Sequence, residues 1–142
     1  MAQAKEKNSP AKKSMPLAHG VGRRKSSVAR AWFQRGTGKI EIDGVDIKQY
    51  FDTDIDYLNA TKAFRLVPMS SNYDVHALVN GGGKVAQSDA LKLALARCFV
   101  LLDEACRAVL KKEKLLRVDS RVKERKKPGQ KAARRKFQFV KR

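Results

Sequence analysis

The chain ends in a basic segment whose side chains suit phosphate binding. Residues 121–142 read RVKERKKPGQKAARRKFQFVKR and hold eleven Lys or Arg against one acidic residue, a net charge of +10. The basic residues are Arg121, Lys123, Arg125, Lys126, Lys127, Lys131, Arg134, Arg135, Lys136, Lys141 and Arg142. Such a segment repels itself and stays extended until a polyanion neutralises it. Because Lys and Arg pair with phosphates and displace their counterions, the segment predicts a nucleic-acid-binding tail, in which Phe137 and Phe139 could stack on bases.

A second basic site comes before the first predicted strand and consists of Gly22, Arg23, Arg24, Lys25 and Ser26. Glycine lets the backbone amides approach a phosphate closely, and three consecutive cations add charge. The alternative is the start of a strand with solvated charges. We favour RNA contact.

A third candidate is the loop formed by Gly81, Gly82, Gly83 and Lys84 in front of a predicted helix. Free amides and the helix dipole bind anions at such a position. A nucleotide phosphate loop requires four residues between its first Gly and the Gly-Lys pair, and Ser or Thr after the Lys, whereas Val85 follows here. An RNA phosphate is therefore the favoured ligand, with nucleotide binding or a plain flexible turn as alternatives.

The sequence offers no catalytic or metal-binding pattern. Asp52, Asp54 and Asp56 begin like a calcium loop, but its sixth and twelfth positions hold Tyr57 and Ala63 instead of Gly and Glu. The two histidines are far apart, and neither joins a Cys or a carboxylate at metal-ligand spacing. We therefore expect no enzyme activity, no metal, no cofactor and no small-molecule substrate.

The charge is divided unevenly along the chain and predicts its organisation. Of the total of +18, residues 1–30 carry +7, residues 31–120 carry +1 and the tail carries the rest. A near-neutral body with two cationic arms indicates that the body folds and the arms bind. We expect a disordered basic extension at 1–19, a globular body at 20–116 and an extended RNA-binding tail at 117–142.

Compartment signals are few. Cys98 and Cys106 fall in one helical pattern about 12 Å apart, too far for a disulfide, and free thiols fit a reducing compartment. No apolar run approaches the roughly 18 residues of a membrane span, and the N-terminus lacks the apolar core of a secretory signal. A cytoplasmic protein without membrane contact is expected.

Alternating apolar residues predict the strands of the body. Ala29, Ala31 and Phe33 fall on one face of a strand over 28–33, and residues 39–42 alternate again after a Gly-rich turn. These two runs predict a β-hairpin. A third strand over 73–80 is expected at the centre of the sheet.

The helices expected in the body lie over 54–66, 88–105 and 107–116. Pro68 ends the first, Ser88 is the expected N-cap of the second, and apolar residues at 3–4 spacing predict that the second packs across the sheet. The fold class is therefore α+β, a small mixed sheet with helices packed on one face.

Several separated motifs carry a family resemblance. GRRKSSVAR at 22–30, GTGKIEIDG at 36–44, QYF at 49–51, VNGGGKVAQSDALKLALAR at 79–97 and the tail through VKR resemble the small-subunit ribosomal protein nine family in its bacterial form. The resemblance covers residues 20–142.

The resemblance implies a fold like domain two of ribosomal protein five, with a left-handed βαβ crossover. It implies a place in the head of the small subunit, on the 3′ major domain of the ribosomal RNA and beside other head proteins. The Gly22–Ser26 segment, the Gly81–Lys84 loop and the tail would contact ribosomal RNA. By position, Lys141 and Arg142 would contact the anticodon stem-loop of the P-site tRNA.

The resulting hypothesis is a structural protein of the small ribosomal subunit in the cytoplasm. An organellar ribosome is a variant of this hypothesis, against which the lack of a clear transit peptide argues weakly. Two competitors remain, a phosphate-handling enzyme that uses the Gly81–Lys84 loop and a general nucleic-acid-condensing protein.

Overall fold

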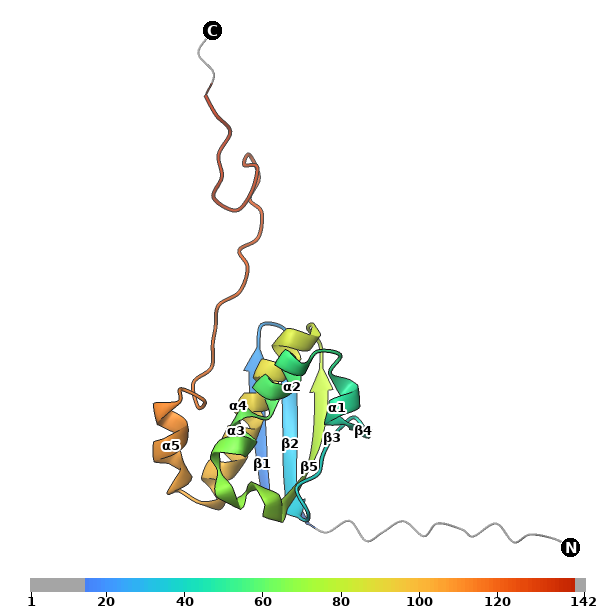
Figure 1. Cartoon of the computed structure of the whole chain (residues 1–142). Coiled ribbons are helices and arrows are strands. Elements are labelled where there is room, and N and C mark those ends of the chain that lie inside the picture. The colour runs from blue at the N-terminus through green and yellow to red at the C-terminus, as the bar shows by residue number, and fades with distance from the viewer. Residues whose placement is uncertain (1–14, 140–142) are drawn as a thin grey trace, which may run out of the picture.

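A five-stranded mixed sheet covered by helices on one face forms the body of the protein (Figure 1). The computed structural model describes residues 15–139. The strands are β1 (Ala18–Arg24), β2 (Ser27–Arg35), β3 (Ile40–Ile42), β4 (Val45–Asp46) and β5 (Tyr73–Asn80), in the order β1-β2-β5-β3-β4. The helices are α1 (Ile47–Tyr50), α2 (Asp54–Ala60), α3 (Lys62–Leu66), the 3-10 helix η1 (Pro68–Asn72), α4 (Lys84–Leu102) and α5 (Cys106–Lys112). The α+β class and the mixed sheet are confirmed.

The hairpin of the sheet is β1–β2, closed where Arg24 pairs with Ser27 across a tight turn in which Lys25 has a φ of 52°. The predicted hairpin between 28–33 and 39–42 is wrong, because β5 lies between these two strands. β5 pairs antiparallel with β2 and parallel with β3. A strand with neighbours on both sides confirms the central position expected for 73–80.

The Asp74 carboxylate explains why β2 and β3 separate. Its Oδ1 accepts backbone hydrogen bonds from Thr37, Gly38 and Lys39 at 2.7, 2.9 and 2.9 Å. The loop after β2 is thereby held against the start of β5, and β3 continues on the far side of β5. The helices between β3 and β5 form the crossover of this parallel pair, whose handedness stays a prediction.

Two glycines let α4 lie directly on β1. A Cβ at Gly20 would be 2.4 Å from the Ala94 carbonyl oxygen, and one at Gly22 would be 1.9 Å from the Ala90 carbonyl oxygen. Both contacts are to helix backbone, so only glycine permits this spacing. The sequence pattern did not predict β1, because glycine is depleted in strands and interrupts the alternation of apolar side chains.

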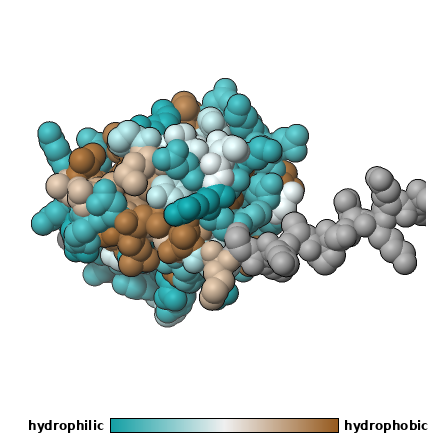
Figure 2. All heavy atoms as spheres, turned by 90° about the horizontal axis from the view of Figure 1, so that it is seen from below, coloured by the Kyte–Doolittle hydropathy of each residue, from teal (hydrophilic) through white to brown (hydrophobic). Residues whose placement is uncertain are grey.

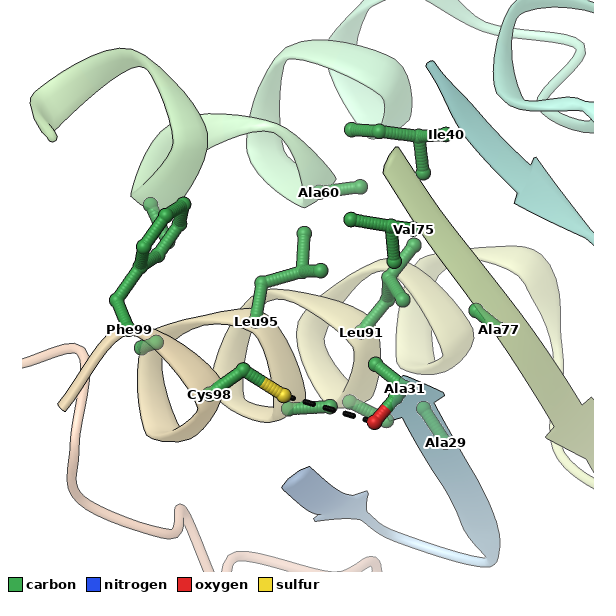
Figure 3. Packing of buried hydrophobic residues seen from close by; sticks show 14 of the residues in the cluster. Ala29, Ala31, Ile40, Ala60, Val75, Ala77, Leu91, Leu95, Cys98 and Phe99 are labelled. Carbon is green, nitrogen blue, oxygen red and sulfur yellow. Dashed lines mark hydrogen bonds between the residues drawn. The ribbon is translucent and has the colours of Figure 1, made fainter. Parts of the chain in front are cut away.

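The core lies between α4 and the sheet (Figure 3). The face of β2 formed by Ala29, Ala31 and Phe33 is fully buried. The Phe33 and Phe99 rings pack edge to face, with their centroids 4.9 Å apart. The Cys98 thiol donates a hydrogen bond to the Ala31 carbonyl oxygen at 3.5 Å. The alternating residues of β2 and the residues at 3–4 spacing in α4 therefore form one apolar layer.

Several helix boundaries differ from those expected. α4 begins at Lys84 with Gly83 as N-cap, and Ser88 is buried inside the helix, where its hydroxyl donates to the Val85 carbonyl oxygen at 2.9 Å. The region 54–66 forms two short helices that meet at Thr61. Cys106 starts α5, whereas Cys98 lies in α4, so the two free thiols are not in one helix.

Residues 113–139 form no helix or strand; Leu115 is still buried in the core, and the chain beyond residue 121 leads away from the body (Figure 1). β1 starts at Ala18, inside the expected N-terminal extension, whose first fourteen residues lie outside the described part. No helix within residues 15–139 is long and apolar enough to cross a membrane.

Candidate nucleic-acid interface

The β1–β2 turn and the glycine loop after β5 are neighbours at one end of the sheet (Figure 1). A Cβ placed on Gly81 would be 2.7 Å from the Ser26 carbonyl oxygen, and one on Gly82 would be 2.9 Å from the Ser27 Cβ. Both glycines have positive φ, 73° and 70°, which favours glycine at these positions. The β1–β2 turn and the glycine loop, which are far apart in sequence, therefore form one surface at this end of the sheet. We call this surface the edge.

The tail root, residues 117–121, joins this edge through the Arg24 side chain. The Arg24 Nη1 donates to the backbone carbonyl oxygens of Asp119 and Arg121 at 3.2 and 2.7 Å. Its Nη2 lies 3.1 Å from the Asp119 carboxylate and its Nε 3.4 Å from Asp89 on α4. With 13% of its side chain exposed, Arg24 faces the protein and links β1, α4 and the tail.

A pocket of about 510 Å³ lies where body and tail root meet. Its charged lining contains six cations and two carboxylates, namely Arg23, Arg24, Lys92, Lys114, Arg117 and Arg121 with Asp89 and Asp119. The sequence interpretation missed Lys92, Lys114 and Arg117. These residues stand in segments of balanced charge, so only the fold reveals that they converge.

Asp89 is the acidic centre of this junction. Partial burial alone would raise the pKa of its carboxyl, but hydrogen bonds from Lys92 and Asn59, the Lys92 charge and the Arg24 contact hold the pKa below its usual value. The pKa of Asp119 is likewise lowered, chiefly by its hydrogen bonds from Arg121. Both residues therefore stay ionised and keep Arg24 and Lys92 in place.

Several predicted RNA contacts of the body, Gly22, Arg24 and Lys84 among them, have partners inside the protein. Arg24 is bound as described, and Gly22 is buried against α4. The Lys84 ammonium donates to the Tyr50 carbonyl oxygen at 2.7 Å and lies 3.8 Å from the centre of the Tyr50 ring. The side chains of Arg23 and Lys25, in contrast, are exposed and form no hydrogen bond or ion pair within residues 15–139.

All predicted contact residues of the tail that the structure describes are exposed; they are Arg121, Lys123, Arg125, Lys126, Lys127, Lys131, Arg134, Arg135 and Lys136. Arg134 is paired with Glu124 through two contacts of 2.8 and 2.9 Å. Lys131 lies 5.5 Å from the centre of the Phe137 ring. Lys141 and Arg142 lie outside the described residues.

The opposite end of the body has a different surface. Figure 2 shows apolar side chains gathered there among hydrophilic ones. Within residues 15–139, no group of three or more His, Cys, Asp or Glu side chains is placed to hold a metal ion.

The comparison with known proteins decides the family. The family model described as "Ribosomal protein S9/S16" matches residues 22–142. The chain belongs to this family. The match confirms the resemblance inferred from the motifs, and it includes the edge, the tail root and the tail.

Curated relatives of the S9 family agree. A protein of Cytophaga hutchinsonii is 41% identical over 128 residues, which is 90% of this chain and all of the relative. One from Christiangramia forsetii is 44% identical over the same coverage, and one from Chlorobium luteolum is 44% identical over 122 residues, 86% of this chain and 95% of the relative. Each is named "Small ribosomal subunit protein uS9".

Proposed function

We propose that this S9-family chain is a structural constituent of the small ribosomal subunit of cytoplasmic ribosomes. It binds the ribosomal RNA of the head, in the 3′ major domain, next to other head proteins. The observation that carries the proposal is the convergence of the β1–β2 turn, the glycine loop and the tail root at one edge, in a chain with a tail charge of +10. The curated relatives named as small-subunit proteins support it.

The edge and the tail have different tasks in this proposal. The exposed Arg23 and Lys25 contact phosphates from a rigid turn, while Arg24 fixes the point from which the tail leaves. The tail then runs along RNA and neutralises phosphates where helices crowd together. Because these contacts are ionic, the binding depends on charge and shape rather than on base sequence.

The tip of the tail has the second role. Lys141 and Arg142, by their position in the family pattern, contact the anticodon stem-loop of the P-site tRNA. Two cations at the end of an extended chain hold a phosphate backbone without reading its bases. They would steady the tRNA during translation.

The test is sedimentation of a cell lysate on a sucrose gradient, with the protein followed by antibody before and after ribonuclease. We expect stoichiometric migration with small subunits that collapses on digestion. A protein that stays at the top of the gradient or follows DNA would contradict the ribosomal role and favour one of the two competitors. Saturable magnesium–ATP binding would then identify the enzyme among them.

Salt dependence tests the mechanism with purified components. If about six to ten phosphates are contacted, the affinity for the isolated RNA should fall roughly 10³–10⁵-fold between about 50 and 200 mM salt. A matched chain with Lys126, Lys127, Arg134 and Arg135 changed to Gln should show a shallower slope. An affinity insensitive to salt would remove the phosphate mechanism.

A further inference from the structure

The sheet has a second face, opposite to the helices. Along each strand the residues alternate, so that those next to the buried ones point away from α4. Among the described residues these side chains are exposed or half-buried. They include aromatic rings and arginines as well as ordinary polar groups.

A row of aromatic rings crosses this face. The strand register places His19 beside Trp32, Trp32 beside His76, and His76 beside Glu41. The His19 and Trp32 rings are stacked, with centroids 5.1 Å apart and an angle of 27° between their planes. The His76 Nδ1 lies 3.2 Å from Glu41 Oε2, which fixes the other end of the row. Both histidines of the chain and its single tryptophan thus stand together.

Two free arginines accompany this row. In the register, Arg30 lies between Val21 and Leu78, and Arg23 pairs with Val28. Both guanidinium groups are exposed and form no hydrogen bond or ion pair in the part of the chain that the structure describes. Leu78, with 46% of its surface exposed, adds an apolar contact.

We propose that this open sheet face binds unpaired nucleotides of RNA. Bases stack on the Trp32 and histidine rings, and phosphates pair with Arg23 and Arg30. Aromatic rings on a sheet combined with cations are the means by which proteins hold single-stranded RNA. The inference deepens the proposed function and rests on it, since the partner is the same RNA.

Charge decides between RNA and a protein partner. Aromatic residues and arginine are also enriched at protein interfaces, so the two unpaired arginines alone do not decide; RNA is favoured because the chain carries a net charge of +18 and belongs to a ribosomal protein family. The charge of the two arginines complements a polyanion. Duplex RNA fits less well, since its bases are stacked on each other and its readable groove is shallow.

Trp32 provides a direct test, because it is the only tryptophan in the chain. The full-length protein is titrated with a single-stranded RNA 12-mer and with the same sequence as a duplex, and binding is followed by Trp32 fluorescence and by the anisotropy of labelled RNA. We expect saturable quenching by the single strand alone, while both RNAs raise the anisotropy through the tail. Single-strand binding without quenching would overturn the proposal.

Variants separate stacking from charge. Trp32→Ala should weaken single-strand binding by about tenfold or more while duplex binding is retained, since one stacked base contributes about that factor. Trp32→Phe keeps an aromatic ring and should retain most of the affinity. This result would show that a loss in Trp32→Ala comes from the missing ring and not from misfolding. The control is Ile55→Ala on α2, an exposed residue away from the open face. Unchanged single-strand affinity in Trp32→Ala would overturn the proposal.

A photo-crosslinker at position 78 tests the face in assembled small subunits. Crosslinks to RNA would support the proposal, and crosslinks to a protein would overturn it in favour of a protein neighbour. A chain that sediments with small subunits but shows no quenching of Trp32 leaves the proposed function intact and removes only this inference. A chain absent from small subunits would remove the proposed function itself.

Discussion

Arg24 and Asp119 join the first strand of the sheet to the root of the tail. The Arg24 Nη2 lies 3.1 Å from the Asp119 carboxylate, and Nη1 donates to the Asp119 carbonyl oxygen at 3.2 Å. A guanidinium can bind a carboxylate and backbone carbonyls at the same time because its donors form a rigid fork. The direction in which the tail leaves the body is therefore set by a residue of β1.

Replacing Arg24 should release the tail root. Arg24→Met keeps much of the side-chain volume but removes every hydrogen bond to Asp89, Asp119 and Arg121. We expect trypsin to cut after Arg117 and Arg121 several times faster, with cleavage after the exposed Lys136 unchanged as the internal reference. Since charge-assisted hydrogen bonds contribute about 1.5–3 kcal/mol each, the free energy of unfolding should also fall by about that much.

Arg23→Met is the matched control for Arg24→Met. It removes the same charge from the neighbouring position, but its guanidinium has no partner within residues 15–139. We expect normal stability and normal cleavage at the tail root, with weaker RNA binding. Equal proteolysis of the two variants would show that Arg24 does not hold the tail.

Gly22 should be required for the packing of β1 on α4. In Gly22→Ala the new Cβ would lie 1.9 Å from the Ala90 carbonyl oxygen and 2.7 Å from the Ala94 nitrogen. Both are helix backbone atoms that cannot move independently, so the free energy of unfolding should fall by about 2 kcal/mol or more in urea denaturation.

Gly83→Ser is the control for this glycine. A Cβ there meets nothing within 4 Å, and Ser is a favoured residue at the N-cap of α4. Its stability should be unchanged or slightly higher. If Gly22→Ala instead kept normal stability and lost RNA affinity, Gly22 would serve a phosphate contact, as the sequence interpretation supposed.

Arg24 and Gly22 illustrate how far the sequence determines the site. Composition located the cations of the tail and the turn, because charge is visible without a fold. It assigned Arg24 and Gly22 to RNA together with Arg23 and Lys25, although their tasks differ. The distinction depends on which side chains face α4 and the tail root, and that follows only from the packing of segments far apart in the chain.

The fold shows the same limit. Period-two alternation predicted β2 and β5, and 3–4 spacing predicted most of α4. The pairing of strands failed, since Asp74 binds the loop after β2 and brings β5 between β2 and β3. A hydrogen bond between positions so distant in sequence leaves no local signal, and neither does the glycine-mediated contact that defines β1.

The Asp74 carboxylate should make stability depend on acidity. Partial burial would raise its pKa, but the backbone N–H groups of Lys39, Thr37 and Gly38 lower the pKa below the usual value. Since an unfolded aspartate titrates near about 3.9, the unfolded chain binds the proton more readily than the folded one. The contribution of Asp74 is therefore complete above about pH 4 and is lost as the pH falls further.

Urea denaturation between about pH 2 and 7 checks this dependence. Asp74→Asn should be less stable than the parent at pH 7, and the difference should shrink on acidification as Asp74 becomes protonated. Asp52→Asn is the control, because Asp52 is exposed and forms no hydrogen bond within the described residues. A constant difference between parent and Asp74→Asn at every pH would contradict the ionic role of this carboxylate.

Glu124, the single acidic residue of the 121–142 segment, should restrain RNA binding. Its carboxylate accepts two contacts from Arg134, at 2.8 and 2.9 Å, and the Arg134 hydrogen bond lowers the pKa of Glu124. RNA has to compete with this pair for Arg134. In Glu124→Gln, Arg134 is released and a negative charge is removed, so the affinity at low salt should rise several-fold. The slope of log K against log salt should steepen by about 0.7–0.9, the value for one more phosphate contact.

Glu104→Gln removes the same charge next to Arg107 in the body and serves as control. An equal gain in that variant would mean that net charge alone, and not the Glu124–Arg134 pair, sets the affinity.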